Sequence, residues 1–583
     1  MEEAKMKARR LIGMLLCLAV LASLLAGCAK TQSGAPAETG QTVQSTDTPN
    51  QAQETAEPEV ERKLVVGIQS QVNITDYEDN YLTKLVAETL DCELEMVLLP
   101  ADLSELTTKL ALMATTPQEL PDIILTDGLN YQVVNQYGAN GIFVDVMPYL
   151  EDPSKTPNFN AIGEEYQQSM FEACAINGKM YTFPSLTANA WDCTPYRMYI
   201  NQTWLDKLGL EIPTTTEEYK EVLRAFATQD PNGNGVADEI PIYGVTGNKV
   251  WGGNCIVNLM NAFIYYNPDT NNGLALDETG KKVIAPFTMD GFKEGLAYMH
   301  ELYSEGLLPD AIFTDDSTQF KSVLNNEECN IVGSVVTGSY GNWSDADNNP
   351  NFNDMTLIDP LIGPEGVQYT AYNGVEIHRN MVITCNCKNI DLAVAFGDLF
   401  YSHEFSQTSR FGELGVDWVD WTEDAEFLKD YTSCEVEAGL AEAPTHYVIN
   451  DIWTTDTNKF WHGYNPRFAP ATNNQAKDNM LKETFAETGS KLKSNQARIH
   501  SMSVIYYMHP DHIIPVLSYD DEAFAQIGDI SLNIYNYVNQ AMAQFIVGER
   551  DIETGWDSYL QELDAMGLQQ WLEVSQTTFE AAH

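Results

Sequence analysis

The sequence predicts an α/β fold in which a parallel sheet is covered by helices on both faces. Between residues 63 and 139, short apolar runs of strand type alternate with helical patterns, and the connections between them are short. Strands that alternate with helices in this way pair in parallel, because each helix carries the chain back across the sheet. At 583 residues with 44% hydrophobic side chains, the chain can hold two or three domains with sizeable cores.

The expected elements of this first region follow one another in a regular order. They are strand Leu64–Ile68, helix Tyr81–Leu90, strand Cys92–Leu99, helix Leu103–Ala114, strand Asp122–Leu125 and helix Tyr131–Ala139. Next, Asn177 and Gly178 are expected to form a tight turn between two extended runs. The later part of the chain adds helix Phe292–Glu305, strand Ile331–Val336 and helix Ala393–Tyr401.

The loop from Asp230 to Pro241 carries oxygen donors at alternate positions. It reads Asp-Pro-Asn-Gly-Asn-Gly-Val-Ala-Asp-Glu-Ile-Pro, and a helix opened by a Thr215–Glu218 capping box leads into it. Calcium prefers six to eight oxygen ligands in a flexible cage, and glycines let such a loop turn sharply. The sequence therefore predicts a calcium site whose ligands are Asp230, Asn232, Asn234, the Val236 carbonyl, Asp238 and Glu239.

This loop matches the EF-hand pattern up to the ninth position, but its twelfth position holds Pro241 in place of glutamate. Glu239, at the tenth position, is the expected substitute for that bidentate acid. The alternative interpretation is a solvated turn between a helix and a strand, since Asp, Asn and Gly also form turns. Five spaced side-chain oxygen donors within ten residues favour calcium.

The loop and the segment before it resemble a known family. From Asn201 the chain reads N-x-x-W-L-x-K-L-G-L-x-I-P-x-T-x-x-E, and the calcium loop follows. This pairing is similar to the extracellular solute-binding proteins of family 1, the oligosaccharide-binding lipoproteins of ABC importers. Further segments resemble that family in the same order, namely Leu120–Ile124, Asn177–Pro184, Phe411–Trp418 and the two segments Phe545–Gly548 and Trp556–Leu568.

The resemblance implies a two-lobed fold of the periplasmic-binding-protein type, with two α/β lobes joined by crossing hinge segments and a ligand cleft between them. Residues 62–583 would form this solute-binding domain. Lobe 1 would comprise about 62–185 and 325–395, and lobe 2 about 186–324 and 396–583. The resemblance also implies a monomeric protein that binds an oligosaccharide without catalysis, holds a structural calcium ion and delivers its ligand to ABC transporter permease subunits.

Residues 1–27 are predicted to be a lipoprotein signal peptide. A basic start precedes the uncharged run Leu11–Ala26, which is short for a membrane span of about 20 residues. The ending Leu25-Ala-Gly-Cys28 resembles the bacterial lipobox, which implies cleavage before Cys28 and acylation of its sulfur. Two acyl chains hold a protein stably on a bilayer, so we expect it at the extracellular face of the cell membrane. The alternative is an ordinary secretory signal followed by a coincidental cysteine.

Composition predicts a disordered segment and narrows the kinds of binding partner and cross-link. After Cys28, residues 29–61 contain no aromatic side chain and are rich in Ser, Thr, Gln, Pro, Ala and Glu, which predicts a disordered tether over 28–61. The formal net charge of −52 disfavours binding to nucleic acid or to an anionic membrane surface. The ten cysteines show neither a dense disulfide framework nor a zinc spacing.

The sequence holds 10 Trp and 28 Tyr residues, and flat aromatic rings suit the apolar faces of sugars. Trp251, Trp343 and Trp418 lie beside glycine and polar residues, and Trp191 and Asp192 follow the turn segment where members of the resembled family expose cleft residues. These five are the predicted ligand-binding residues. The alternative is that each tryptophan is a core residue, because large aromatics are usually mostly buried.

Two other functions stay open at this point. The sequence lacks the G-x-S-x-G, phosphate-loop and H-E-x-x-H motifs, but with 84 acids a glycosidase-like carboxylate pair could arise in any cleft. A lipid-anchored glycoside hydrolase is therefore one alternative, and a receptor lipoprotein that signals to a membrane kinase is another. Whether the ligand is a sugar or a peptide is also open.

Overall fold

The computed structural model describes residues 62–582, except residues 72, 130, 189, 248, 345, 421–445, 451, 454–456, 471–474, 478–496, 498–499 and 502–503. The signal peptide, Cys28 and the tether expected over residues 1–61 lie outside the described residues. Across the part of the chain that is described, no helix has both the length and the apolar character needed to cross a membrane.

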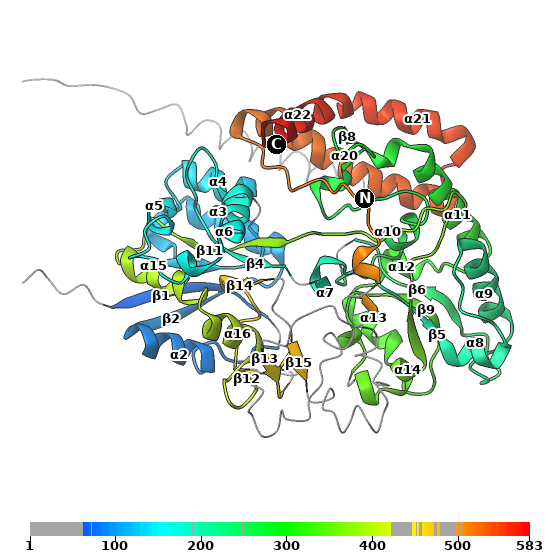
Figure 1. Cartoon of the computed structure of the whole chain (residues 1–583), viewed down its shortest axis with the longest axis horizontal. Helices are drawn as coiled ribbons and strands as arrows, with labels where there is room; N and C mark the ends of the chain where they lie inside the picture. Colours follow the sequence, from blue (N-terminus) through cyan, green and yellow to red (C-terminus); the bar gives the residue numbers. More distant parts are fainter. Residues whose placement is uncertain are drawn as a thin grey trace, which may run out of the picture. The chain divides into compact units, whose positions relative to one another are not determined.

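A six-stranded mixed sheet has the order β14-β4-β11-β3-β1-β2 (Figure 1). Its strands are β1 (Lys63–Gln69), β2 (Glu93–Leu99), β3 (Ile123–Leu125), β4 (Phe183–Thr187), β11 (Glu376–Ile383) and β14 (Arg467–Ala469). Strand β1 pairs in parallel with β2 and β3, as predicted, and β14 pairs in parallel with β4. Strand β11 runs antiparallel to both β3 and β4, which makes the sheet mixed.

A second sheet has four strands in the order β10-β5-β9-β6. They are β5 (Met198–Asn201), β6 (Ile240–Tyr243), β9 (Val332–Val336) and β10 (Met355–Ile358). Two smaller sheets are formed by β12 (Trp418–Asp420), β13 (His446–Val448) and β15 (Gln475–Lys477), and by β7 (Ala275–Leu276) and β8 (Val283–Ile284). The two large sheets have separate hydrophobic cores, so the α/β protein has two lobes.

The expected lobe boundaries need correction. Residues 325–373 were expected in lobe 1, but they carry β9 and β10, which belong to the four-stranded sheet of lobe 2. Residues 396–470 were expected in lobe 2, but they carry β14 of the six-stranded sheet. Strand pairing joins segments that are far apart in sequence, so the order of motifs along the chain does not determine which sheet a strand joins.

The predicted helices over Tyr81–Leu90, Leu103–Ala114 and Tyr131–Ala139 are confirmed with these bounds as α2, α3 and α4. Helices α11 (Asp290–Ser304) and α15 (Ile390–Leu399) begin and end slightly earlier than expected. The other helices are α5 (Met147–Leu150), α6 (Glu164–Cys174), α7 (Ala190–Cys193), α8 (Gln202–Leu208), α9 (Thr216–Thr228), α10 (Cys255–Met260), α12 (Ala311–Thr314), α13 (Ser317–Leu324), α14 (Pro350–Asn353) and α16 (His403–Phe411).

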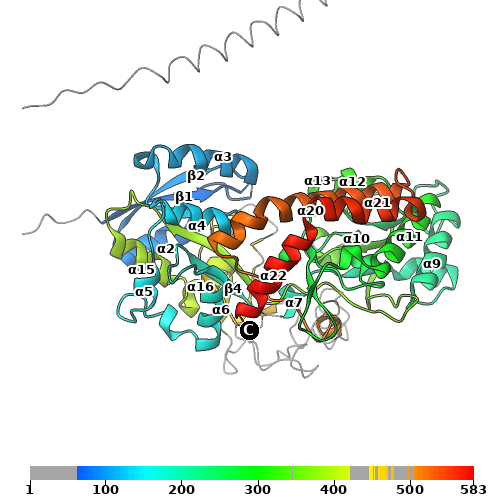
Figure 2. The ribbon, with the colours of Figure 1, turned by 90° about the horizontal axis from the view of Figure 1, so that it is seen from above.

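Three helices end the described part of the chain. They are α20 (Asp521–Val547), α21 (Ile552–Ala565) and α22 (Leu568–Ala582), which contact one another and lie together in Figure 2. Helix α20 also packs on α11 of lobe 2. Earlier in the chain, the predicted Asn177-Gly178 turn is confirmed, because both residues have left-handed φ values of 51° and 73°.

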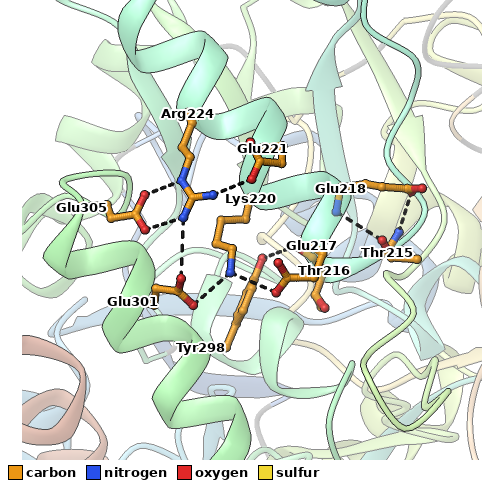
Figure 3. A network of polar contacts seen from close by, with 10 residues as sticks. All are labelled: Thr215, Thr216, Glu217, Glu218, Lys220, Glu221, Arg224, Tyr298, Glu301 and Glu305. Atoms are coloured by element: carbon orange, nitrogen blue, oxygen red, sulfur yellow. Dashed lines mark hydrogen bonds and ion pairs between the residues drawn. The ribbon is translucent and has the colours of Figure 1, made fainter.

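Helix α9 is tied to α11 by charged side chains (Figure 3). It opens with the predicted capping box of Thr215 and Glu218. The side chain of Lys220 is only 5% exposed, and its Nζ lies 2.9 Å from carboxylate oxygens of Glu217 and of Glu301 on α11. Because α9 leads into the loop that begins at Asp230, these contacts fix the helix that positions the expected calcium loop.

Candidate functional site

A cavity of about 640 Å³ is lined by residues of both lobes, and we call it the interlobe cavity. Lobe 1 contributes side chains from β4, β11 and β14 and from the segments beside them, including Asp127, Ser185, Thr187, Glu376, His378, Asn380, Arg410 and Arg467. Lobe 2 contributes Trp251 before α10, Lys321 on α13, and Ser339, Tyr340 and Asn342 after β9. Ligands of open α/β sheets commonly bind at such strand ends.

Three of the predicted ligand-binding residues, Trp191, Asp192 and Trp251, line this cavity. The Trp251 side chain is 39% exposed, which is high for a tryptophan. The Arg197 guanidinium carbon lies 3.5 Å from the centroid of the Trp191 ring and 5.4 Å from that of Trp251. One buried cation therefore contacts both rings.

Arg197 is itself held by several acceptors. Its side chain is buried, its Nε donates to Ser501 Oγ at 2.8 Å, and its Nη1 donates to the Gly338 carbonyl oxygen at 2.5 Å. Its Nη2 donates to the backbone carbonyl oxygen of Trp191. These bonds fix the guanidinium plane, and so they fix the rings that contact it.

The predictions for Trp343 and Trp418 are wrong. Trp343 is 1% exposed and packs in a core, with its ring centroid 5.5 Å from that of Tyr199 and 4.8 Å from that of Phe352. Trp418 is fully buried, and its Nε1 donates to the Gly412 carbonyl at 3.0 Å. Neighbouring glycine and polar residues do not show which way a side chain points, and a ring without an exposed face cannot contact a ligand.

The structure adds aromatic residues that were not among the predicted ligand-binding set. Tyr340, Trp453 and Tyr464 also line the interlobe cavity. The ring centroid of Tyr340 lies 5.6 Å from that of Trp191. Arg410 lies over the Trp453 ring, 4.0 Å from its centroid. Tyrosines are too frequent in this sequence to be selected by type, and only their position beside the cavity distinguishes these two.

Two histidines of the cavity have opposite charge states. His378 Nδ1 lies 2.8 Å from Asp127 Oδ1, and its Nε2 lies 3.7 Å from Glu376 Oε2. Burial disfavours the charged imidazole, but the contacts with these two carboxylates outweigh it and raise the pKa of His378 to about 10. Burial and the nearby Arg410 charge lower the pKa of His462 to about 4. At neutral pH, His378 is therefore a cation and His462 is neutral.

Arg467 on β14 is held within the six-stranded sheet, because its backbone pairs in register with Ser185 on β4. Its Nε is buried and has no hydrogen-bond partner within the described part of the chain. Burial, and then the neighbouring charge of Arg410, lower the pKa of Arg467 to about 9. Its guanidinium is therefore still a cation at neutral pH.

The loop predicted to bind calcium has a tightly turned backbone. Asp230, Gly233 and Gly235 have φ values of 46°, 77° and 75°. Asp230 Oδ1 accepts a hydrogen bond from the Gly233 N–H at 3.0 Å, and Asn234 Oδ1 accepts one from the Val236 N–H at 2.7 Å. This is the local backbone bonding of a turn, so it agrees with both interpretations of the loop.

Other contacts test whether the loop suits a cation. The amide nitrogens of Asn232 and Asn234 donate to Asp238 at 2.9 and 3.0 Å, and no group of three or more His, Cys, Asp and Glu side chains gathers as a metal site among the described residues. Glu239 Oε1, however, is buried and has no hydrogen-bond partner in the described part of the chain. Burial raises the pKa of Glu239, and the charges of Asp238 and Asp230 add to this. The oxygen donor set and the orphaned carboxylate oxygen fit a hard cation.

Two α/β lobes surround a cavity of aromatic, amide and charged side chains, an arrangement that is suited to binding a solute. No family model matches the sequence. The chain is 26% identical over 482 residues to the fructooligosaccharide ABC transporter substrate-binding protein FusA of Streptococcus pneumoniae, over 79% of this chain and 80% of FusA. It is also 26% identical over 254 residues to the lipoprotein LipO of Bacillus subtilis, over 42% of this chain and 46% of LipO.

Solved structures show the same fold. An HMO-binding, ABC-transporter-associated solute-binding protein of Bifidobacterium longum infantis superposes with a TM-score of 0.69 at 20% identity, over 90% of this chain and 99% of that one. An EF-hand mutant of FusA of S. pneumoniae in complex with fructo-nystose superposes with a TM-score of 0.67 at 22% identity, over 89% and 99%. The two-lobed fold and the resemblance to solute-binding proteins are therefore confirmed, and this chain is a homologue of ABC-transporter substrate-binding proteins.

Proposed function

We propose that this protein is the membrane-anchored substrate-binding component of an ABC importer and that it captures an oligosaccharide in the interlobe cavity. The observation that carries the proposal is the pair of rings, Trp191 and Trp251, held beside the cavity by the buried Arg197. The similarity to FusA over 482 residues supports the same class of ligand.

The cavity offers the two kinds of contact that a sugar needs. The rings of Trp191, Trp251 and Trp453 can pack against the apolar C–H faces of pyranose or furanose units. Amide and hydroxyl groups on both sides can hydrogen-bond to sugar hydroxyls, among them Asn342 from lobe 2 and Asn380 from lobe 1. No part of this arrangement requires a bond to be broken in the ligand.

We expect the lobes to close on the ligand, because the residues that would contact it are divided between the two lobes. Trp251 and Asn342 belong to lobe 2, whereas Trp453 and Asn380 belong to lobe 1. A ligand that contacts both sets gains more free energy in the closed arrangement than in an open one, and this difference shifts the equilibrium toward closure.

We also propose that the loop from Asp230 to Glu239 holds one structural calcium ion. Asp230, Asp238 and Glu239 would supply carboxylate oxygens, and Asn232 and Asn234 would supply side-chain oxygens after their amide groups rotate. The orphaned Glu239 Oε1 supports this proposal, as does the existence of an EF-hand mutant of FusA. The ion would brace the turn between α9 and β6, and it has no role in binding the sugar.

Isothermal calorimetry of the mature protein with a panel of oligosaccharides tests the proposed function. We expect at least one oligosaccharide to bind, and Trp191→Ala to weaken that binding by about 1–3 kcal/mol. Tyr507, an aromatic residue outside the cavity lining with 65% of its surface exposed, provides the control variant Tyr507→Ala, which should bind normally. If no oligosaccharide binds, or if chromatography shows that the bound sugar is cleaved, the proposal fails and a peptide-binding or glycosidase role replaces it.

A further inference from the structure

The interlobe cavity has a charge balance opposite to that of the whole protein. The chain carries a formal net charge of −52. Among the described residues, the cavity lining nevertheless includes four positively charged side chains, which are Lys321, His378, Arg410 and Arg467, and three acids, which are Asp127, Asp192 and Glu376. Of these acids, Asp127 and Glu376 already contact His378. Those two carboxylates therefore do not pair with Arg467, and Asp192 is the acid of the lining whose charge acts on it.

Arg467 makes no close ion pair among the described residues, although the charge of Asp192 acts on it from beyond ion-pair distance. Within the described residues, it has no carboxylate within 4.0 Å of its nitrogens, and its buried Nε has no hydrogen-bond partner. A partly buried cation without a paired anion is destabilised, because the protein interior replaces water's solvation poorly. The hydroxyl of a neutral sugar supplies a hydrogen bond, but it supplies no opposite charge.

The position of Arg467 is also fixed before any ligand arrives. Its backbone belongs to β14, which pairs with β4, and the adjacent Phe468 carbonyl accepts a hydrogen bond from Ser406 Oγ at 2.7 Å. A planar guanidinium on a rigid strand is suited to pairing with a carboxylate through two parallel hydrogen bonds.

Resting on the oligosaccharide-binding function proposed above, we propose that the natural ligand is an acidic oligosaccharide and that Arg467 pairs with a carboxylate of one of its uronic acid units. Lys321 and Arg410 add to the positive potential of the same cavity and favour the same ligand class. The aromatic rings then bind the apolar faces of the sugar units, while Arg467 selects for the charge.

The test compares ligands of equal length that differ in the carboxylate alone. The mature protein is titrated with an oligouronate, with its methyl ester and with its carboxyl-reduced neutral counterpart. We expect the oligouronate to bind about 10–100-fold more tightly than either neutral form, as for a hydrogen-bonded charge pair. We also expect this preference to shrink as salt is added.

The variant Arg467→Gln should bind the acidic and neutral ligands with similar affinity. Arg379→Gln is the matched control, because Arg379 lies on β11 of the same sheet but is not part of the cavity lining. This control should keep the preference. Melting curves of both variants establish that they are folded, and the wild-type comparison of acid with ester tests the proposal without any variant.

Equal binding of the acid and its ester by the wild type would overturn the inference and leave the proposed function intact. If Arg467→Gln still binds the acid more tightly than the neutral ligands, Arg467 is not the residue that pairs with the carboxylate. Tighter binding of a sulfated oligosaccharide of the same length would overturn the assignment to carboxylates. Failure of all of these ligands and of neutral sugars to bind would instead overturn the proposed function itself.

Discussion

The guanidinium of Arg197 lies over the Trp191 ring, 3.5 Å from its centroid, and the same group donates a hydrogen bond to the Trp191 backbone carbonyl. The ring and the backbone of this aromatic residue are therefore fixed by one cation. Both residues lie where the chain crosses from β4 of lobe 1 to β5 of lobe 2. The crossing segment thus places an aromatic ring at the interlobe cavity.

Replacement of this arginine is expected to affect both stability and binding. Arg197→Met would leave the Gly338 carbonyl and Ser501 Oγ without their donor and would release Trp191. We expect a loss of about 1–3 kcal/mol in the free energy of unfolding, measured by urea denaturation, and weaker oligosaccharide binding. Arg62 donates to the carbonyls of Leu90 and Asp91 at an exposed site, so Arg62→Met should change stability by less than about 1 kcal/mol and leave binding unchanged. If Arg197→Met and Arg62→Met lost the same amount of unfolding free energy and of binding affinity, this explanation would be wrong.

Exposed and buried tryptophans should respond differently to truncation. Trp251→Ala should lower oligosaccharide affinity by about 1–3 kcal/mol with little change in stability, because the ring is 39% exposed beside the cavity. Trp343→Ala should lower the free energy of unfolding by about 3–5 kcal/mol, because it empties part of a core. Calorimetry and urea denaturation measure the two quantities. A large stability loss for Trp251→Ala would show that this ring is structural.

His378 gives the protein a defined pH dependence. Its pKa is raised from 6.5 to about 10 by Asp127 and Glu376, against the effect of burial. A raised pKa means that the folded state binds the proton more tightly, so this stabilisation is fully present below pH 6.5 and is lost as pH rises through about 10. The difference in unfolding free energy between wild type and His378→Gln should therefore shrink between pH 7 and pH 10.

Nuclear magnetic resonance of the imidazole provides a direct check. The His378 ring should stay charged at pH 8, and the His462 ring should stay neutral down to about pH 5, since its pKa is lowered to about 4. If both rings titrate near pH 6.5, the contacts of His378 with Asp127 and Glu376 do not act on its charge.

Calcium removal should lower the melting temperature. An ion that binds only the folded protein stabilises it by about 3 kcal/mol at a hundredfold excess over the dissociation constant. A chelator should therefore destabilise the wild type, whereas Asp230→Ala should melt at the same temperature with and without chelator. Asp277, whose Oδ1 accepts hydrogen bonds from Lys281 and Lys282 in another turn, provides the control. Asp277→Ala should keep the response to chelator. If the melting temperature of the wild type is the same with and without chelator, the loop is a turn that binds no calcium.

Membrane attachment should depend on Cys28. Cys28→Ala removes the sulfur that would carry the acyl group, so the protein should no longer incorporate a labelled fatty acid or sediment with membranes. Cys385, an exposed cysteine of the folded part, provides the control variant Cys385→Ala, which should be labelled normally. Absence of label on the wild-type protein would remove the lipid anchor from the proposal.

Local sequence signals predicted the first part of the chain well. The Asn80 side chain accepts a hydrogen bond from the Leu82 N–H, and Asp102 caps the Glu105 N–H in the same way, so α2 and α3 begin where their capping residues indicate. The bounds of these helices depend on residues within a few positions of one another. The turn at Asn177-Gly178 and the capping box at Thr215 are local features of the same kind.

The sequence by itself determined the helices and strands of the first lobe, the capping boxes and turns, and the motif order that resembles solute-binding proteins. Only the tertiary structure decided that β9 and β10 belong to lobe 2 and β14 to lobe 1, that Trp343 and Trp418 are buried, and that Arg467 lines the interlobe cavity with no ion-pair partner among the described residues. The physical reason is the range of the interactions. Capping bonds and helical periodicity join neighbours in sequence, whereas sheet membership, burial and charge pairing are set by contacts between residues hundreds of positions apart, such as the register of Arg467 with Ser185.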